Sequence, residues 1–290
     1  MSLRNFRVVI LAAQRKGATD PLAQRFGVSH KCVAPLHGYP LIGHVLRTVA
    51  GYPSVETVMV SIEAEAFDLV RPAFPAASPS AAPIACVAAA DNIADSVIAA
   101  AEGHDGPILI TTADNALLTR ASLDAMLKAL QRHDAAIGMA GREAVLSAHP
   151  DGQRRFYKFR DGEFSNCNLY GLANSKALRA AEIFRGGGQF AKKASRIVEA
   201  FGLINLALLR LRLLSLPGGL RRISRRIGLD IAPVVLLDGS QAIDVDNDRT
   251  YGVVSELLAR RGPPQPMLSG SAGVRTGEIA EHHLPLASGY

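Results

Sequence analysis

The sequence predicts an α/β fold: a mostly parallel sheet with helices on both faces. Short runs of Val, Ile and Leu that fit buried strands alternate with longer segments whose apolar residues recur at helical spacing. The alternation breaks once, around Asp161-Gly162, where two strand-like segments in succession predict a β-hairpin. At 290 residues, 48% of them hydrophobic, the chain is long enough for one large domain, which we expect over residues 1–262.

Each element follows from the local pattern. Strands are expected at 7–12, 55–62, 84–87, 107–112, 135–140 and 232–237, with the hairpin inside 155–172. Helices are expected at 41–50, 63–70, 93–101, 120–132 and 250–259. Residues 72–83 read as a loop, and residues 263–290, rich in Pro, Gly and Ser, as a disordered tail. Since parallel sheets bind ligands at the carboxyl ends of their strands, we look for site residues there.

Composition and charge narrow the class of protein. No apolar run is long enough to span a bilayer, and residues 1–7 carry no signal-peptide pattern, so we expect a cytoplasmic protein. The three cysteines (Cys32, Cys86 and Cys167) are far apart, which fits a reducing compartment and offers no zinc-site spacing.

The positive charge is concentrated in residues 185–230, which we interpret as a basic helical insertion. This segment holds ten basic residues and two acidic ones, an excess larger than the net charge of +6 of the whole chain. Nucleic-acid binding is not expected, because no aromatic platform for stacking bases accompanies the arginines and no tandem motif appears. A solvated helical subdomain, a lid over an anionic acceptor, a homodimer face and a peripheral contact with an anionic membrane all remain open.

A strand that runs into a basic loop is the most informative local feature. Val8 to Leu11 lead into Ala12, Ala13, Gln14, Arg15, Lys16 and Gly17, and Lys31 precedes a turn that reads Gly38-Tyr39-Pro40-Leu41-Ile42. Backbone N–H groups of such a loop can wrap a chain of phosphates, while the basic side chains neutralise its charge.

This arrangement resembles the N-terminus of the MobA-like and sugar-phosphate nucleotidyltransferases. Their sequences read roughly Leu-Ala-Ala-Gly, a basic loop, Pro-Lys and Gly-x-Pro-Leu/Met-Ile; here Gln14 stands for the glycine and His30 for the proline. The resemblance implies a Rossmann-like sheet of GT-A type and an NTP substrate. It also implies that residues 12–17 and Lys31 bind the nucleotide, with Arg15 and Lys31 acting in catalysis.

Two acidic segments complete the resemblance. Asp114 follows a buried strand in a segment similar to the family's Asp-x-Pro-Leu-Leu/Ile-Thr motif, with Ala116 in place of the proline, which implies that Asp114 binds catalytic Mg²⁺. The later Asp244-Val245-Asp246 is similar to a second family motif, and alternate residues of an extended chain face the same side. Asp246, or Asp244, is therefore expected to complete the metal site, with Asp248 capping the last helix.

Two further segments are assigned to the substrates by resemblance. Asp91, Asn92 and Ser96 occupy a segment that contacts the base or ribose in the family, although simple capping of the next helix explains Asp91 or Asn92 equally well. Asn166 stands where the family's Asn-Thr-Gly-Ile-Tyr segment contacts the acceptor. Asn168 replaces the glycine there and is one of the few residue types that tolerate positive φ.

The sequence as a whole favours a Mg²⁺-dependent nucleotidyltransferase. The implied reaction transfers NMP from an NTP, with CTP or GTP favoured, to a phosphorylated sugar, polyol or lipid-headgroup precursor, and releases pyrophosphate. The alternatives are a GT-A glycosyltransferase and a non-catalytic homologue that binds nucleotide or a membrane. The first usually carries Asp-x-Asp after a central strand, where this chain has Ala113-Asp114-Asn115.

Overall fold

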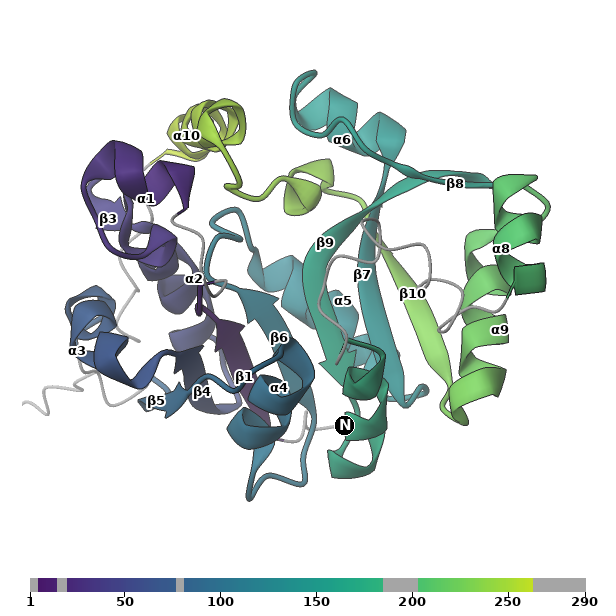
Figure 1. The fold of residues 1–290 in the computed structure, drawn as a ribbon, viewed down its shortest axis with the longest axis horizontal. Helices are drawn as coiled ribbons and strands as arrows, with labels where there is room; N and C mark the ends of the chain where they lie inside the picture. The colour runs from purple at the N-terminus through teal and green to yellow at the C-terminus, as the bar shows by residue number, and fades with distance from the viewer. Residues whose placement is uncertain (1–4, 15–19, 77–80, 185–202, 263–290) are drawn as a thin grey trace, which may run out of the picture.

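An eight-stranded sheet forms the centre of the molecule in the computed structural model, which describes residues 5–14, 20–76, 81–184 and 203–262 (Figure 1). Seven strands lie in the order β10-β7-β9-β6-β1-β4-β5, and β8 pairs with β9 outside this path. The β1–β4, β1–β6, β4–β5 and β7–β10 pairs are parallel, whereas β9 runs antiparallel to β6, β7 and β8. The mostly parallel α/β sheet and the hairpin excursion are confirmed.

The sheet consists of strands β1 (Phe6–Leu11), β4 (Val55–Ile62), β5 (Ile84–Ala88), β6 (Ile108–Thr112), β7 (Ala135–Gly141), β8 (Tyr157–Phe159), β9 (Gly162–Leu172) and β10 (Ile231–Leu236). A separate two-stranded sheet joins β2 (Pro35–Leu36) to β3 (Tyr39–Pro40). The α-helices are α1 (Pro21–Phe26), α2 (Leu41–Ala50), α3 (Phe67–Val70), α4 (Ile93–Ala101), α5 (Arg120–Leu130), α6 (Arg142–Ala148), α8 (Leu203–Arg210), α9 (Leu216–Ile227) and α10 (Asp248–Arg261). Short 3₁₀ segments lie at Lys31–Val33, Ala64–Ala66, Arg71–Ala73, Ser175–Phe184 and Gly239–Ala242.

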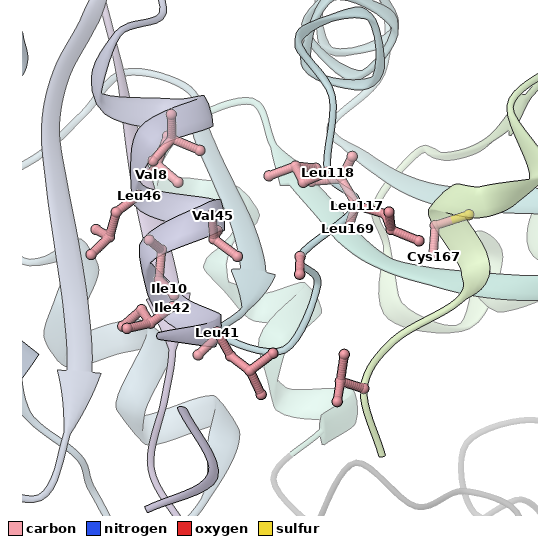
Figure 2. Close-up of a cluster of buried hydrophobic side chains, with 14 of the residues drawn as sticks. Val8, Ile10, Leu41, Ile42, Val45, Leu46, Leu117, Leu118, Cys167 and Leu169 are labelled. Carbon is pink, nitrogen blue, oxygen red and sulfur yellow. The ribbon is translucent and has the colours of Figure 1, made fainter. Parts of the chain in front are cut away.

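Both faces of the sheet are buried. Successive side chains of β1 point to opposite faces and pack into two different cores. Val8 and Ile10 belong to one core with the apolar face of α2, where Leu41, Val45 and Leu46 are fully buried (Figure 2). Val9 belongs to a second core on the opposite face, with apolar side chains of α4 and α9. Burial on both sides explains why β1 reads as a continuous apolar run rather than an alternating one.

Several local predictions were wrong. The hairpin loop is Arg160-Asp161, and Gly162, expected in the turn, opens β9 opposite Phe159. Helices α1 and α6 were not predicted, because each is only six or seven residues long and carries too few turns for a periodic pattern. Asp248 does not cap the last helix: Asn247 is its N-cap, accepting from Thr250 N at 3.2 Å, and Asp248 is its first residue.

The basic segment is helical where the structure describes it. Ser215 caps α9, and α9 buries Leu216, Leu220 and Ile223 in the second core. Residues 185–202 and the tail at 263–290 lie outside the described residues, so the predicted insertion and tail boundaries stay predictions. Within the described ranges, every helix is too short or too polar to span a bilayer.

Candidate active site

Asp114 lies just beyond the carboxyl end of β6 and is paired with Lys31, which is brought there from 83 residues earlier in the chain. Lys31 Nζ donates to Asp114 Oδ2 at 2.5 Å and to Asp246 Oδ1 at 3.3 Å. Thr112 Oγ1 donates to the other oxygen of Asp114, so both oxygens of this carboxylate have partners. The side chains of Asp114 and Lys31 are 13% and 20% exposed, and this burial strengthens their attraction.

Three carboxylates converge at this point. Oxygen atoms of Asp114, Asp244 and Asp246 all lie within 4.8 Å of one another, as the extended-chain argument predicted for the last two. Together with Lys31 they form what we call the acidic site, in which three carboxylates face one ammonium group.

The pKa values of Asp244 and Lys31 are both raised in the acidic site. Burial, followed by the negative charges of Asp114 and Asp246, raises the pKa of Asp244 well above its usual range. Burial alone would lower the pKa of Lys31, but the attraction of Asp114 and Asp246 outweighs it and raises that pKa above its ordinary value. Lys31 is therefore a fixed positive charge, and the site still lacks cationic charge.

The late acidic segment is anchored to β6 and to α10. Val245 N donates to the backbone oxygen of Asp114 at 3.2 Å, which fixes the flanking Asp244 and Asp246 beside that residue. A capping box at the start of α10 joins Asn247 and Thr250, and Asp246 N donates to Thr250 Oγ1 at 2.8 Å. The position of Asp246 is thus set by helix capping as well as by its charge.

A bulge in β9 places Asn168 at the same site. The pairing of β9 with β7 shifts register between Ile137 and Met139, and Asn168 takes a positive φ of 47°, as its residue type allowed. Its Nδ2 donates to Asp244 Oδ2 at 2.9 Å, and its backbone N donates to Asn166 Oδ1 at 3.0 Å. The predicted acceptor residue Asn166, which also donates to Tyr170 Oη, is therefore linked to the acidic site through Asn168.

The segment between β1 and Lys31, residues 12–30, is what we call the first loop, and the structure describes it except for residues 15–19. Ala12 is buried and Ala13 exposed beyond β1, and both precede Gln14; Arg15, Lys16 and Gly17 lie outside the described residues. Gln14 donates from its backbone N to Glu63 Oε1 at 2.8 Å and from Nε2 to Ser29 O at 2.6 Å. The second oxygen of Glu63 lies 3.4 Å from His30 Nε2, next to Lys31. Glu63 therefore ties both ends of the loop to the carboxyl end of β4.

The residues predicted to contact the base are largely occupied by local structure. Asn92 is the N-cap of α4, accepting from Asp95 N at 2.9 Å. Ser96 is buried, donates to Asn92 O and accepts from Ala90 N. Asp91 is exposed just before this cap. The predicted contact of these residues with the base stays a prediction.

Sequence reasoning missed Glu63 and the bond between Asn168 and Asp244. Glu63 could have been found, because it directly follows the parallel strand β4 at the sheet edge where ligands bind. The bond from Asn168 could not, since it depends on a bulge and joins residues 76 positions apart.

The acidic site fits a hard divalent cation. Its donors are all carboxylate oxygens, which suit Mg²⁺ and offer none of the sulfur or imidazole ligands typical of structural zinc sites. Burial and, after it, the negative charges of Asp114 and Asp246 raise the pKa of Asp244, and a bound cation would offset those negative charges. Asp114, Asp244 and Asp246 are the residues that could hold the ion, with phosphate oxygens and waters completing its shell.

Comparison with known proteins gave a consistent result. A family model described as MobA-like NTP transferase domain matches residues 8–194. A hypothetical transferase from Thermus thermophilus is 23% identical with a TM-score of 0.68, covering 86% of this chain and 99% of that one. Two further solved structures share the fold. One is a 4-diphosphocytidyl-2C-methyl-D-erythritol synthase from Anaerococcus prevotii, 10% identical with a TM-score of 0.54, covering 89% of this chain and 100% of that one. The other is a CMP:2-keto-3-deoxy-manno-octonic acid synthetase complexed with CTP, 13% identical with a TM-score of 0.55, covering 89% of this chain and 99% of that one. A search of curated sequences found no match.

Proposed function

The chain belongs to the MobA-like NTP transferase domain family, a family of nucleotidyltransferases, and we propose that it transfers NMP from an NTP to a phosphorylated small molecule with the help of Mg²⁺. The observation that carries this proposal is the acidic site, where three carboxylates and one lysine meet at the carboxyl edge of the sheet. Oxygen ligands suit a metal that accompanies a triphosphate, and Lys31 suits the phosphates themselves.

The chemistry assigned to the chain requires positioning and charge neutralisation. An oxygen of the acceptor phosphate forms a bond to the α-phosphorus of the NTP, the bond from that phosphorus to the bridging oxygen breaks, and its electron pair leaves with pyrophosphate. Because the attacking phosphate is already ionised, no side chain has to remove a proton. Mg²⁺, held by Asp114 and Asp246 or Asp244, would offset phosphate charge. Lys31 and Arg15 would neutralise the charge that grows in the transition state.

The remaining roles are proposed from position. Ala12 to Gly17 would contribute backbone N–H groups to the phosphates, with Lys16 adding a charge. Asp91, Asn92 and Ser96 would contact the base or ribose, and Asn166 the acceptor. We favour CTP or GTP as the substrate. CTP is supported by two proteins of the same fold: one is named a 4-diphosphocytidyl-2C-methyl-D-erythritol synthase, and the other is a CMP:2-keto-3-deoxy-manno-octonic acid synthetase complexed with CTP. A sugar, polyol or lipid-headgroup phosphate is the proposed acceptor class.

The first experiment measures the melting temperature with each of the four NTPs, with and without Mg²⁺. We expect one NTP to raise the melting temperature only when Mg²⁺ is present, because a ligand that binds the native state stabilises it. Asp114→Ala should remove that shift and abolish pyrophosphate release without unfolding the protein. Asp248→Ala, which removes an exposed carboxylate near the site, is the matched control and should retain both. Full turnover by Asp114→Ala would refute the metal assignment, and no shift with any NTP would refute the enzyme.

A further inference from the structure

We propose that the protein docks on anionic phospholipid membranes through a surface formed by α8, α9 and the β8–β9 turn. This α8–α9 surface consists of Arg160, Leu211, Leu213, Arg221, Arg222 and Arg225. It lies at the edge of the molecule beyond β10, on the opposite side from α1 and α3 (Figure 1). It is separate from the acidic site and plays no part in the proposed reaction.

The four arginines of this surface form no ion pair with a described residue. Arg160, Arg221, Arg222 and Arg225 are all exposed, and no carboxylate of the described residues lies within 4 Å of any of them. The guanidinium of Arg222 donates instead to Asn205 Oδ1 at 3.0 Å. These four arginines line a shallow hollow of about 390 Å³ together with Leu213. Converging guanidinium groups of this kind are the usual partners of phosphate oxygens.

Large apolar side chains accompany the arginines. Leu211 and Leu213 are 67% and 54% exposed, in the turn that joins α8 to α9. Between them lies Arg212, whose positive φ of 56° belongs to the same tight turn. Exposed leucines beside basic residues are typical of surfaces that enter the headgroup region of a bilayer, where apolar side chains leave water and arginines meet lipid phosphates.

The surface is held in place by the fold. Leu216 N, at the start of α9, donates to Asp161 Oδ1 at 2.8 Å, and Arg160 N donates to Leu214 O at 2.8 Å. The buried face of α9 packs in the second core, and Gly219 lies against the ring of Phe159 from β8. Three of the four arginines therefore project from a helix whose backbone is held in place by the fold, so binding requires no backbone rearrangement there.

The leucines favour a membrane over a nucleic acid. A nucleic-acid backbone would pair with the arginines but would leave Leu211 and Leu213 exposed to water, and none of the described residues that line the hollow is aromatic, so they offer no ring for a base to stack on. A bilayer satisfies both halves of the surface.

The test is co-sedimentation of the full chain with vesicles of phosphatidylglycerol in phosphatidylcholine, against vesicles of phosphatidylcholine alone, at low and high salt. We expect binding only to the anionic vesicles and release at high salt. The triple variant Arg221→Ala/Arg222→Ala/Arg225→Ala should bind on the order of 100-fold more weakly, since each basic residue near such a surface contributes roughly a factor of five. The double variant Leu211→Ser/Leu213→Ser should bind the anionic vesicles roughly ten-fold more weakly than the native protein.

A matched control removes the same charge elsewhere. Lys128→Ala/Arg132→Ala/Lys176→Ala replaces three exposed basic residues outside the surface and should bind as the native protein does. Native-like binding by the arginine triple variant, no binding of the native protein at low salt, or undiminished binding by the leucine variant would each overturn the proposal. So would binding of duplex RNA through the same arginines without vesicle binding. Circular dichroism and unchanged pyrophosphate release with soluble substrates establish that the variants fold.

Discussion

The acidic site joins Lys31 to Asp246 across 215 positions of sequence, whereas three of the four arginines of the α8–α9 surface come from one helix. In the first region opposite charges are partly buried and hydrogen-bonded to one another. In the second region like charges are exposed and face solvent. We propose that both regions bind phosphate; among the described residues, charge pairing within the protein fixes the geometry of the acidic site but not that of the α8–α9 surface.

The two regions should therefore differ in how strongly single substitutions and salt affect them. Removing one partner of a buried ion pair leaves an uncompensated charge, so the acidic site should respond strongly to single substitutions. The exposed arginines are screened by salt and act together, so their effects should be smaller individually and sensitive to ionic strength.

The largest effect is expected for Lys31→Gln. Three carboxylates would then repel one another without an ammonium group, and we expect about 2–3 kcal/mol of lost stability in the presence of a chelator. Urea unfolding measures this loss, and Mg²⁺ should restore part of it. Pyrophosphate release should fall by roughly 10²–10³-fold, as for other groups that neutralise transition-state charge. Lys128→Gln, an exposed lysine of α5, is the control, and equal stability of both variants would remove the contrast between the two regions.

The pH dependence of the metal-free protein comes next. Because the folded protein raises the pKa of Asp244, the folded state binds more protons than the unfolded state, and stability falls as pH rises from about 4 towards neutrality. This contribution is fully present only below the ordinary carboxyl range. Asp244→Asn should remove up to about 1.4 kcal/mol per pH unit of that slope. Unfolding curves at several pH values check it, and an unchanged slope would contradict the assignment.

A smaller effect is expected for Glu63→Ala, which releases both ends of the first loop. Losing the hydrogen bond from Gln14 N and the contact with His30 should cost about 1–2 kcal/mol of stability. We expect the KM for the nucleotide to rise roughly ten-fold with a smaller change in kcat, because the loop is positioned less well. Glu65→Ala, an exposed neighbour, controls for the lost charge. A fall in kcat alone would show that Glu63 acts otherwise.

The smallest effect is expected for Arg221→Glu. Arg221 and Arg225 lie one turn apart on α9, so the change replaces a repulsion with an attraction and should stabilise the protein by about 0.5 kcal/mol. Arg221→Gln, which removes only the repulsion, should give about half of this. Thermal unfolding at low salt measures the gain. A loss of stability instead would indicate that Arg221 already has a stabilising partner.

The parallel sheet and most element boundaries could be predicted from the sequence pattern, whereas the meeting of Asp114 with Asp246 or Asp244 was implied by the resemblance to the family's two acidic motifs. The sheet and its boundaries follow from local periodicity, and the place of Asp114 follows from the rule that the carboxyl ends of parallel strands meet at one edge. Helix α2 begins and ends at the predicted residues because its apolar face extends over the whole helix.

The partners of those residues depend on the tertiary structure. The bulge that turns Asn168 towards Asp244, the bond from Gln14 to Glu63 and the choice of Asn247 as helix cap depend on how distant segments pack. The alternative arrangements at these positions differ by one hydrogen bond or by one step of strand register. The local sequence pattern does not distinguish between them. The same is true of α9, whose arginines are evident in the sequence, but whose outward face is fixed by the burial of Leu216, Leu220 and Ile223.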